Sequence, residues 1–137
     1  MDREEKKRIL KSYLPLREEL RKIEEEIIFW RSKLTRFGGS VVKFSNTKGT
    51  RINKADEAFE KLEMLDYRFS AKIISLSDLR SRIEDAIEEL DDPIHRLLMR
   101  MRYVEGHTWE LIAVELSYSW QHVHKIHADA LNLINMR

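Results

Sequence analysis

Hydrophobic residues in the first third of the chain recur at alternating spacings of four and three. They are Ile9, Tyr13, Leu16, Leu20, Ile23, Ile27, Trp30, Leu34 and Phe37. Charged residues fill the intervening positions, as in the run REELRKIEEE. Because residues at this spacing lie along one side of an α-helix, the pattern predicts one long amphipathic helix with a narrow hydrophobic stripe. A helix within a bundle and a helix of an oligomerising coiled coil fit this pattern equally well.

Two features bear on where this first helix begins and ends. Pro15 is compatible with a helix if Ser12 caps a new helix there, because a first turn does not use the missing N–H; otherwise the proline kinks the helix. Gly38 and Gly39 predict the end of the helix. Residues 38–54 combine turn-forming and β-branched residues with four cations and no acid, which predicts a basic loop. This loop contacts phosphate groups in one interpretation and is only solvated in the other.

A second hydrophobic stripe predicts another long helix from about Lys54 to Leu90. Its members recur at spacings of seven and three, and they are Ala55, Ala58, Leu62, Leu65, Phe69, Leu76, Leu79, Ile83, Ala86 and Leu90, with Phe59, Ile73 and Ile87 widening the stripe. Two long helices joined by a loop predict an antiparallel hairpin over residues 1–90. Since one hairpin buries such stripes poorly on its own, we expect a homo-oligomer that assembles through these helices.

The last part of the chain predicts three short helices. The run DDP at 91–93 is a strong helix start, and the first helix extends to about Tyr103. Thr108 and Ser119 are the predicted N-caps of the other two. The positions expected to face inward are Ile94, Leu97, Leu98 and Met101, then Trp109, Ile112, Ala113 and Leu116, then Val123, Ile126, Ala130, Leu131 and Ile134. Two short helices joined by a turn of a few residues are typical of a helix-turn-helix.

The composition supports an all-α fold. Only four glycines and two prolines occur in 137 residues, fewer than tightly turned β-proteins use. The predicted fold is therefore a long antiparallel helical hairpin, residues 1–90, followed by a three-helix helix-turn-helix module, residues 91–137. The absence of cysteine excludes disulfides and cysteine catalysis. No catalytic cleft or nucleophile is recognisable, so we expect neither enzyme activity nor a cofactor.

The chain also carries no sign of export or membrane insertion. Its N-terminal residues MDREEKKRIL lack the hydrophobic core of a signal peptide. No hydrophobic run approaches the roughly 20 residues that span a bilayer. We therefore expect a cytoplasmic protein with no membrane partner.

The stretch LLMRMRYVEGHTWELIAVELSYSWQHVHKIHADALNLI resembles the fourth region of bacterial sigma factors, the helix-turn-helix that reads the upstream promoter hexamer. The matching positions are Arg102, Tyr103, Gly106, Thr108, Glu110, Ile112, Ala113, Glu115, Leu116, Ser119, Val123, Ile126, His127, Ala130 and Leu131. The match covers less than a third of the chain, residues 97–134. Many bacterial regulators share this module, so the match identifies the type of module more specifically than the biological role of the protein.

The resemblance implies that the helix opened by Ser119 enters the major groove of DNA. The DNA-binding residues that it implies are Trp120, Gln121, His124 and Lys125 at or near base edges, Ser119 and His122 near phosphates, and Thr108 at the start of the preceding helix. Glutamine pairs with adenine, lysine with guanine, and an aromatic ring contacts the thymine methyl group. The chain departs from the family at Trp120 and Gln121, where sigma factors usually carry Arg and Glu. We therefore expect a different promoter preference.

The whole layout is similar to that of small phage-encoded regulators that activate late transcription. The predicted function is thus a sequence-specific DNA-binding transcriptional regulator encoded by a phage or prophage. Its expected partners are double-stranded promoter or operator DNA and, in one version, host RNA polymerase. Two alternatives are an adaptor that binds RNA polymerase without reading DNA, and a DNA-packaging subunit like the phage small terminase.

Charge and histidine content qualify the predicted function. The net charge of +1 demands no polyanionic partner, and residues 93–137 carry five Lys and Arg against four acids. One module should therefore bind DNA weakly, whereas a dimer would double the contacts. Histidines that gain a proton near pH 6.5 would strengthen binding on acidification.

His124 and His127 lack an evident third ligand, so we expect no metal site. Trp109 is expected in the core and Trp120 in an intermolecular contact.

Overall fold

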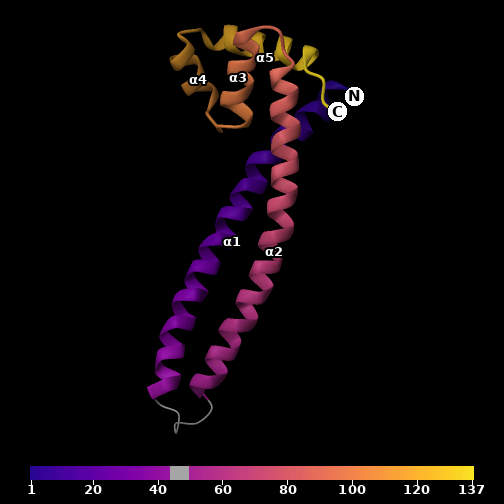
Figure 1. Ribbon diagram of the computed structural model, residues 1–137. Helices are drawn as coiled ribbons and strands as arrows, with labels where there is room; N and C mark the ends of the chain where they lie inside the picture. Colours follow the sequence, from indigo (N-terminus) through magenta and orange to yellow (C-terminus); the bar gives the residue numbers. More distant parts are fainter. Residues whose placement is uncertain (44–49) are drawn as a thin grey trace. The chain divides into compact units, whose positions relative to one another are not determined.

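A computed structural model describes residues 1–43 and 50–137 of the chain, and the side chains of residues 1–36 and 54–137. Within this part the chain forms five α-helices and no strand (Figure 1). They are α1 (Arg3–Lys43), α2 (Thr50–Glu88), α3 (Pro93–Tyr103), α4 (Trp109–Leu116) and α5 (Trp120–Leu133). The predicted all-α class is confirmed, and the two long helices pack together as a hairpin requires. No helix in the described ranges has a hydrophobic stretch long enough to cross a membrane.

The ends of the long helices differ from those predicted. Helix α1 passes through Gly38 and Gly39 and ends at Lys43, because glycine costs only about 1 kcal/mol in a helix interior. Helix α2 begins at Thr50, ahead of the predicted start at Lys54. Most of the predicted basic loop is therefore helical, and its remaining residues, 44–49, lie outside the described residues. Contact between this segment and phosphate stays a prediction.

Pro15 lies inside α1, which is continuous from Arg3. The hydroxyl of Ser12 donates to the carbonyl oxygen of Ile9 at 2.6 Å, within the same helix. The hypothesis that Ser12 caps a new helix is therefore wrong. A long helix tolerates one missing N–H where tertiary packing holds the turns on either side, and Tyr13 beside the proline is fully buried.

Contacts divide the chain into two compact units. The five-helix unit comprises residues 1–17 and 75–137, and the two-helix unit comprises residues 18–74. Both long helices contribute to both units, so both boundaries between the units fall within the predicted hairpin, after residues 17 and 74. Seventeen residues from the start of the chain thus belong with its last three helices (Figure 1).

The five-helix unit has a closed hydrophobic core. Its fully buried members come from every helix and include Leu10 and Tyr13 of α1, Ile83 and Ile87 of α2, Leu98 and Met99 of α3, Ile112 of α4, and Val123, Ala130 and Leu131 of α5. The prediction for α3 is wrong at Leu97, which is 44% exposed, while Met99 is buried in its place. Helix α3 contacts α4 and α5, and its Arg100 reaches Glu88 of α2, so α3 is enclosed on more than one side.

The three predicted helix caps are confirmed. The Asp92 carboxylate accepts a hydrogen bond from the N–H of Ile94 at 2.9 Å, with Pro93 in the first helical position of α3. Thr108 and Ser119 open α4 and α5 in a similar way, each accepting from the backbone N–H three residues further along the chain. Because such caps satisfy N–H groups that a helix leaves unpaired, these polar residues fix where each short helix begins.

The two-helix unit has a thin core between two antiparallel segments of α1 and α2 (Figure 1). Ile23 and Ile27 of α1 pack with Leu62 and Leu65 of α2, and the half-buried Trp30, Leu34 and Phe69 extend this contact. An ion pair between Lys72 and Glu19, 3.0 Å long, joins the two segments. The predicted widening of the stripe is wrong at Phe59 and Ile73, which are exposed, because only two helices are present to cover them.

Candidate nucleic-acid interface

Helix α5 separates a buried face from an exposed polar face. Val123, Ile126, Ala130 and Leu131 are buried in the five-helix unit. Gln121, His122 and Lys125 are exposed on the opposite side. Gln121 and Lys125 are one helical turn apart, so their side chains extend from the same strip of the helix surface. The first two turns of α5 therefore present amide, imidazole and ammonium groups to solvent.

The hydroxyl groups of Thr108 and Ser119 already act within the fold. The Thr108 oxygen accepts from the N–H of Leu111 at 3.2 Å, and the Ser119 oxygen accepts from the N–H of His122 at 3.1 Å. A hydroxyl that accepts one hydrogen bond still has its own O–H to donate. Both residues are exposed, so each hydroxyl is accessible to a phosphate oxygen.

A tight turn holds α5 against α4. Ser117 adopts a left-handed conformation with φ 57°, which is uncommon for a residue other than glycine. The N–H of Ser117 donates to Val114 at 3.2 Å, and the N–H of Tyr118 donates to Ala113 at 3.0 Å. This pair of bonds is a Schellman motif, which pairs the last carbonyls of α4 and reverses the chain at once. Ser119 can then cap α5 only two residues later.

The two tryptophans of this part of the chain lie on either side of one histidine. Trp109 is half-buried and Trp120 is 57% exposed. The ring of His124 lies 4.7 Å from that of Trp109 and 4.0 Å from that of Trp120, measured between centroids. His124 is therefore half-buried beside the exposed face of α5, whereas Gln121 and Lys125 lie on it.

His127 belongs to the core. Its Nε2 lies 2.6 Å from the hydroxyl of Tyr103, and only 6% of its surface is exposed. Burial, together with the nearby positive charge of Lys7, lowers the pKa of His127 to about 4. Burial likewise raises the pKa of Tyr103 to about 12. His127 is thus neutral near pH 7, and the expected gain of charge on mild acidification does not extend to it.

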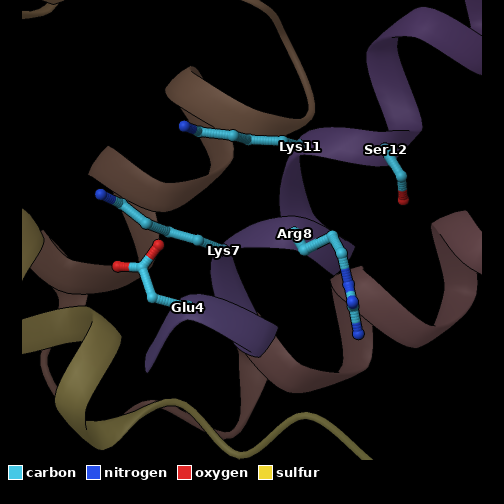
Figure 2. A pocket seen from close by; sticks show the side chains of 5 residues that line it. All are labelled: Glu4, Lys7, Arg8, Lys11 and Ser12. Carbon is cyan, nitrogen blue, oxygen red and sulfur yellow. The ribbon is translucent and has the colours of Figure 1, made fainter. Parts of the chain in front are cut away.

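The structure brings together a group of cations that the sequence had not singled out. A cavity of about 140 Å³ in the five-helix unit is lined by Lys7 and Lys11 of α1, Arg102 and Tyr103 of α3, Trp109 of α4, and His124 and His127 of α5; we call it the aromatic cavity. Figure 2 shows Lys7 and Lys11 extending side by side from α1, with Glu4 close to Lys7, in a neighbouring hollow. The only sequence signal was the run KKRILK, which has four cations within six residues.

Lys6 fixes the start of α1 against the end of α5. Its ammonium donates to the carbonyl oxygens of Leu131 and Asn132 at 3.1 and 3.4 Å. Such carbonyls at a helix C-terminus have no partner within the helix, and a cation there is favourable. This contact keeps Lys7 and Lys11, on the same turns of α1, next to α3 and α5.

Comparison with known proteins finds no match to a protein-family model, a curated protein or a solved structure. Among the described residues, no group of three histidines and carboxylates is placed to hold a metal ion. The resemblance to sigma factors therefore depends on residues 97–134 of the sequence alone. The chemistry of the site follows from its own side chains.

Proposed function

We propose that the chain is a sequence-specific DNA-binding transcriptional regulator whose helix α5 enters the major groove. The observation that carries this proposal is the exposed polar strip of Gln121, His122 and Lys125 on a helix whose opposite face is fully buried. A helix of this kind fits a major groove about 12 Å wide. The short turn after α4 supports a helix-turn-helix, and the resemblance of residues 97–134 to the fourth region of sigma factors agrees with it.

The exposed side chains suit direct reading of bases. Gln121 can pair with both hydrogen-bonding groups of adenine, and Lys125 can donate to O6 and N7 of guanine. Trp120, at the start of the helix, offers a ring for the thymine methyl group. Thr108 and Ser119 can donate their hydroxyl hydrogens to phosphates while remaining helix caps. His124, half-buried between two rings, contributes less to base contact than its neighbours on the exposed strip.

The test is selection of preferred duplexes from random DNA, repeated with Gln121→Ala and Lys125→Ala. We expect each variant to lose preference at one or two base pairs, at a cost of about 1 to 3 kcal/mol for the preferred sequence. Asn132→Ala, an exposed change in the last turn of α5, is the matched control and should leave the preference unchanged. Unaltered preference in both folded variants would refute the docking of α5.

An adaptor for RNA polymerase is the second candidate. Leu111 and Val114 of α4 are 41% and 75% exposed, close in sequence to the exposed Trp120. Exposed hydrophobic residues of this kind favour a protein partner. The adaptor predicts no DNA binding even at low salt, together with stable association with purified polymerase. The DNA reader instead predicts an affinity that falls by several powers of ten per power of ten in salt.

The proposal includes assembly through the two-helix unit. Ile28 and Phe59 are 61% and 58% exposed, and each follows a stripe residue by one position. In an antiparallel pair, positions one step after the stripe lie on the same side of both helices. Tyr67, 78% exposed, extends this side along α2. A second copy of the chain covers such a face by repeating the same stripe, and a dimer would present two α5 helices to DNA.

A further inference from the structure

Three cations from opposite ends of the chain converge on the aromatic cavity. Lys7 and Lys11 come from the second and third turns of α1, and Arg102 comes from the end of α3. The guanidinium of Arg102 lies 4.4 Å from the centre of the Trp109 ring, a cation–π contact that fixes its position. All of these residues belong to the five-helix unit. The three positive charges therefore lie within the same compact unit.

The positive charge at this cavity is poorly neutralised. In the described part of the chain, Lys7 and Lys11 make no ion pair or hydrogen bond that would occupy their ammonium groups. By contrast, Lys6 bonds to carbonyls of α5 and Arg17 donates to the carbonyl of Val104 at 3.1 Å. Glu4 is the acid that lies near Lys7 (Figure 2), and it lines the neighbouring hollow and not the cavity itself. Unsatisfied cations at one place attract an anion.

The size and walls of the cavity select the kind of anion. A volume of about 140 Å³ is below the 300 Å³ or more of typical small-molecule sites but is ample for a phosphate group. Ammonium groups and a planar guanidinium are the side chains that bind phosphate oxygens best. Trp109 and His124 form half-buried aromatic walls, which strengthen charged hydrogen bonds by excluding water. The Nε2 atom of His124 is buried without a hydrogen-bond partner among the described residues.

We propose that Lys7, Lys11 and Arg102 form a phosphate-binding site at the aromatic cavity. The phosphate is held by the two ammonium groups and the free edge of the guanidinium, whose other edge donates to the carbonyl of His107 at 3.1 Å. The site lies beside His124, which touches Trp120 at the start of α5. Its natural ligand is a backbone phosphate of the DNA that α5 reads, and this identification rests on the proposed function.

This site supplies the charge that the short helices lack. Residues 93–137 carry five cations against four acids, which is too nearly neutral for strong phosphate binding. Residues 1–17 add six cations against three acids to the same unit. The N-terminal helix would therefore provide affinity, while the exposed strip of α5 provides sequence preference.

The first arm of the test uses inorganic phosphate without DNA. Phosphate is titrated into the full chain at constant ionic strength, maintained with chloride, while the indole N–H signals are followed by NMR. We expect the Trp109 signal to shift with saturation and the Trp30 signal, which belongs to the two-helix unit, to stay in place. The double variant Lys7→Gln, Lys11→Gln should abolish the shift, and Glu4→Gln should make phosphate bind more tightly.

The second arm uses a DNA duplex and a salt series. Lys7→Gln with Lys11→Gln should weaken binding about tenfold at low salt, reduce the salt slope by about 1, and leave base preference unaltered. Lys22→Gln, an exposed lysine elsewhere on α1, is the control for lost charge and should have little effect.

The two arms distinguish the source of the phosphate. A smaller salt slope in the double variant identifies a DNA phosphate, and saturation by inorganic phosphate with an unchanged slope identifies a free phosphate group as the ligand. Phosphate binding by a chain that binds no DNA would keep the site and refute the proposed function. No shift of Trp109 together with an unchanged salt slope in the double variant overturns the site, even if α5 reads DNA.

Discussion

The two units are built from the same pair of long helices, yet they enclose their hydrophobic residues to different degrees. Among the described residues, the core of the five-helix unit joins 18 buried side chains from all five helices and from the segments that follow them. The core of the two-helix unit joins four, with three more half-buried beside it. A pair of helices that no third element covers gains little stability from packing. The same amphipathic pattern therefore gives an enclosed core in the five-helix unit and a partly exposed core in the two-helix unit.

The exposed hydrophobic residues follow the same division. Ile28, Phe29, Phe59, Tyr67 and Ile74 are all exposed in the two-helix unit. In the five-helix unit the exposed examples are spread over several elements: Leu111 and Val114 of α4 and Trp120 of α5, and also Met1, Leu97 and Leu133. A long amphipathic stripe therefore does not by itself specify whether its neighbours come from the same chain or from another copy.

The largest expected difference between the units is the cost of truncating one core leucine. Leu131→Ala should lower the free energy of unfolding by about 4 kcal/mol, because its neighbours surround it and the cavity cannot collapse. Leu65→Ala should cost about 2 kcal/mol, because a site between two helices relaxes more easily. Urea unfolding followed by circular dichroism measures both. Equal costs would contradict the comparison and indicate that Leu65 is enclosed by more than its own hairpin.

Acid should destabilise the five-helix unit selectively. The pKa of His127 is about 4 in the folded chain against an ordinary value of 6.5, so the unfolded chain binds the proton more readily. Stability should therefore fall as the pH is lowered through 6.5, by up to about 3 kcal/mol, and level off below about pH 4. Hydrogen exchange from pH 7 to 4 should show this loss in α3 and α5. The two-helix unit contains no histidine.

His127→Gln tests the origin of this pH dependence. Glutamine can still reach the Tyr103 hydroxyl but does not titrate, so the loss of stability between pH 6.5 and 4 should be much smaller in the variant. An unchanged pH profile would show that other groups carry it. The same experiment separates this loss of stability from the expected strengthening of DNA binding on acidification, to which the buried His127 does not contribute.

Self-association should depend on the two-helix unit. Phe59→Ser is expected to raise the dissociation constant of the assembly at least tenfold, equivalent to about 1.4 kcal/mol, without lowering the stability of the five-helix unit. Leu133→Ser, an equally exposed hydrophobic residue on α5, is the matched control. Sedimentation velocity measures the effect. A wild-type chain that stays monomeric at all concentrations would refute assembly through this face.

The smallest expected effect concerns the turn between α4 and α5. Ser117→Gly should stabilise the five-helix unit by about 0.5 to 1 kcal/mol, because glycine adopts the left-handed conformation at φ 57° without strain. Ser117→Ala, which lacks this freedom, should not. Thermal unfolding of the three proteins compares them directly. A destabilised glycine variant would show that the Ser117 side chain contributes more than its backbone conformation costs.

The features that could be predicted from the sequence are those fixed by residues close together in it. Asp92, Thr108 and Ser119 cap helices through bonds to N–H groups two or three residues away, so their spacing sufficed. The hydrophobic spacing of α1 and α2 likewise predicted their buried stripes. The predicted end of the first helix at Gly38 and Gly39 is wrong, because a long helix tolerates the small cost of glycine.

The features that could not be predicted depend on which elements meet. Leu97 and Met99 are both hydrophobic and lie two positions apart in α3, and only the packing of neighbouring helices decides which of them is buried. Lys7 and Lys11 look like solvated positions of an amphipathic helix until α1 is seen against α3 and α5. Residues 1–17 and 93–137 are far apart in the sequence, so no local pattern indicates that cations of the first segment line a cavity with residues of the second.

The contact between Lys6 and the carbonyl of Leu131 spans 125 residues of sequence. A ribosome adds about 5 to 20 residues per second, so α5 is synthesised roughly 6 to 25 seconds after the start of α1. The contact between them can form only after that time. The two-helix unit can form during this interval from residues already made. Nascent chains released before α5 would then carry the basic start of α1 without the cavity that organises it, so only completed polypeptides would hold phosphate.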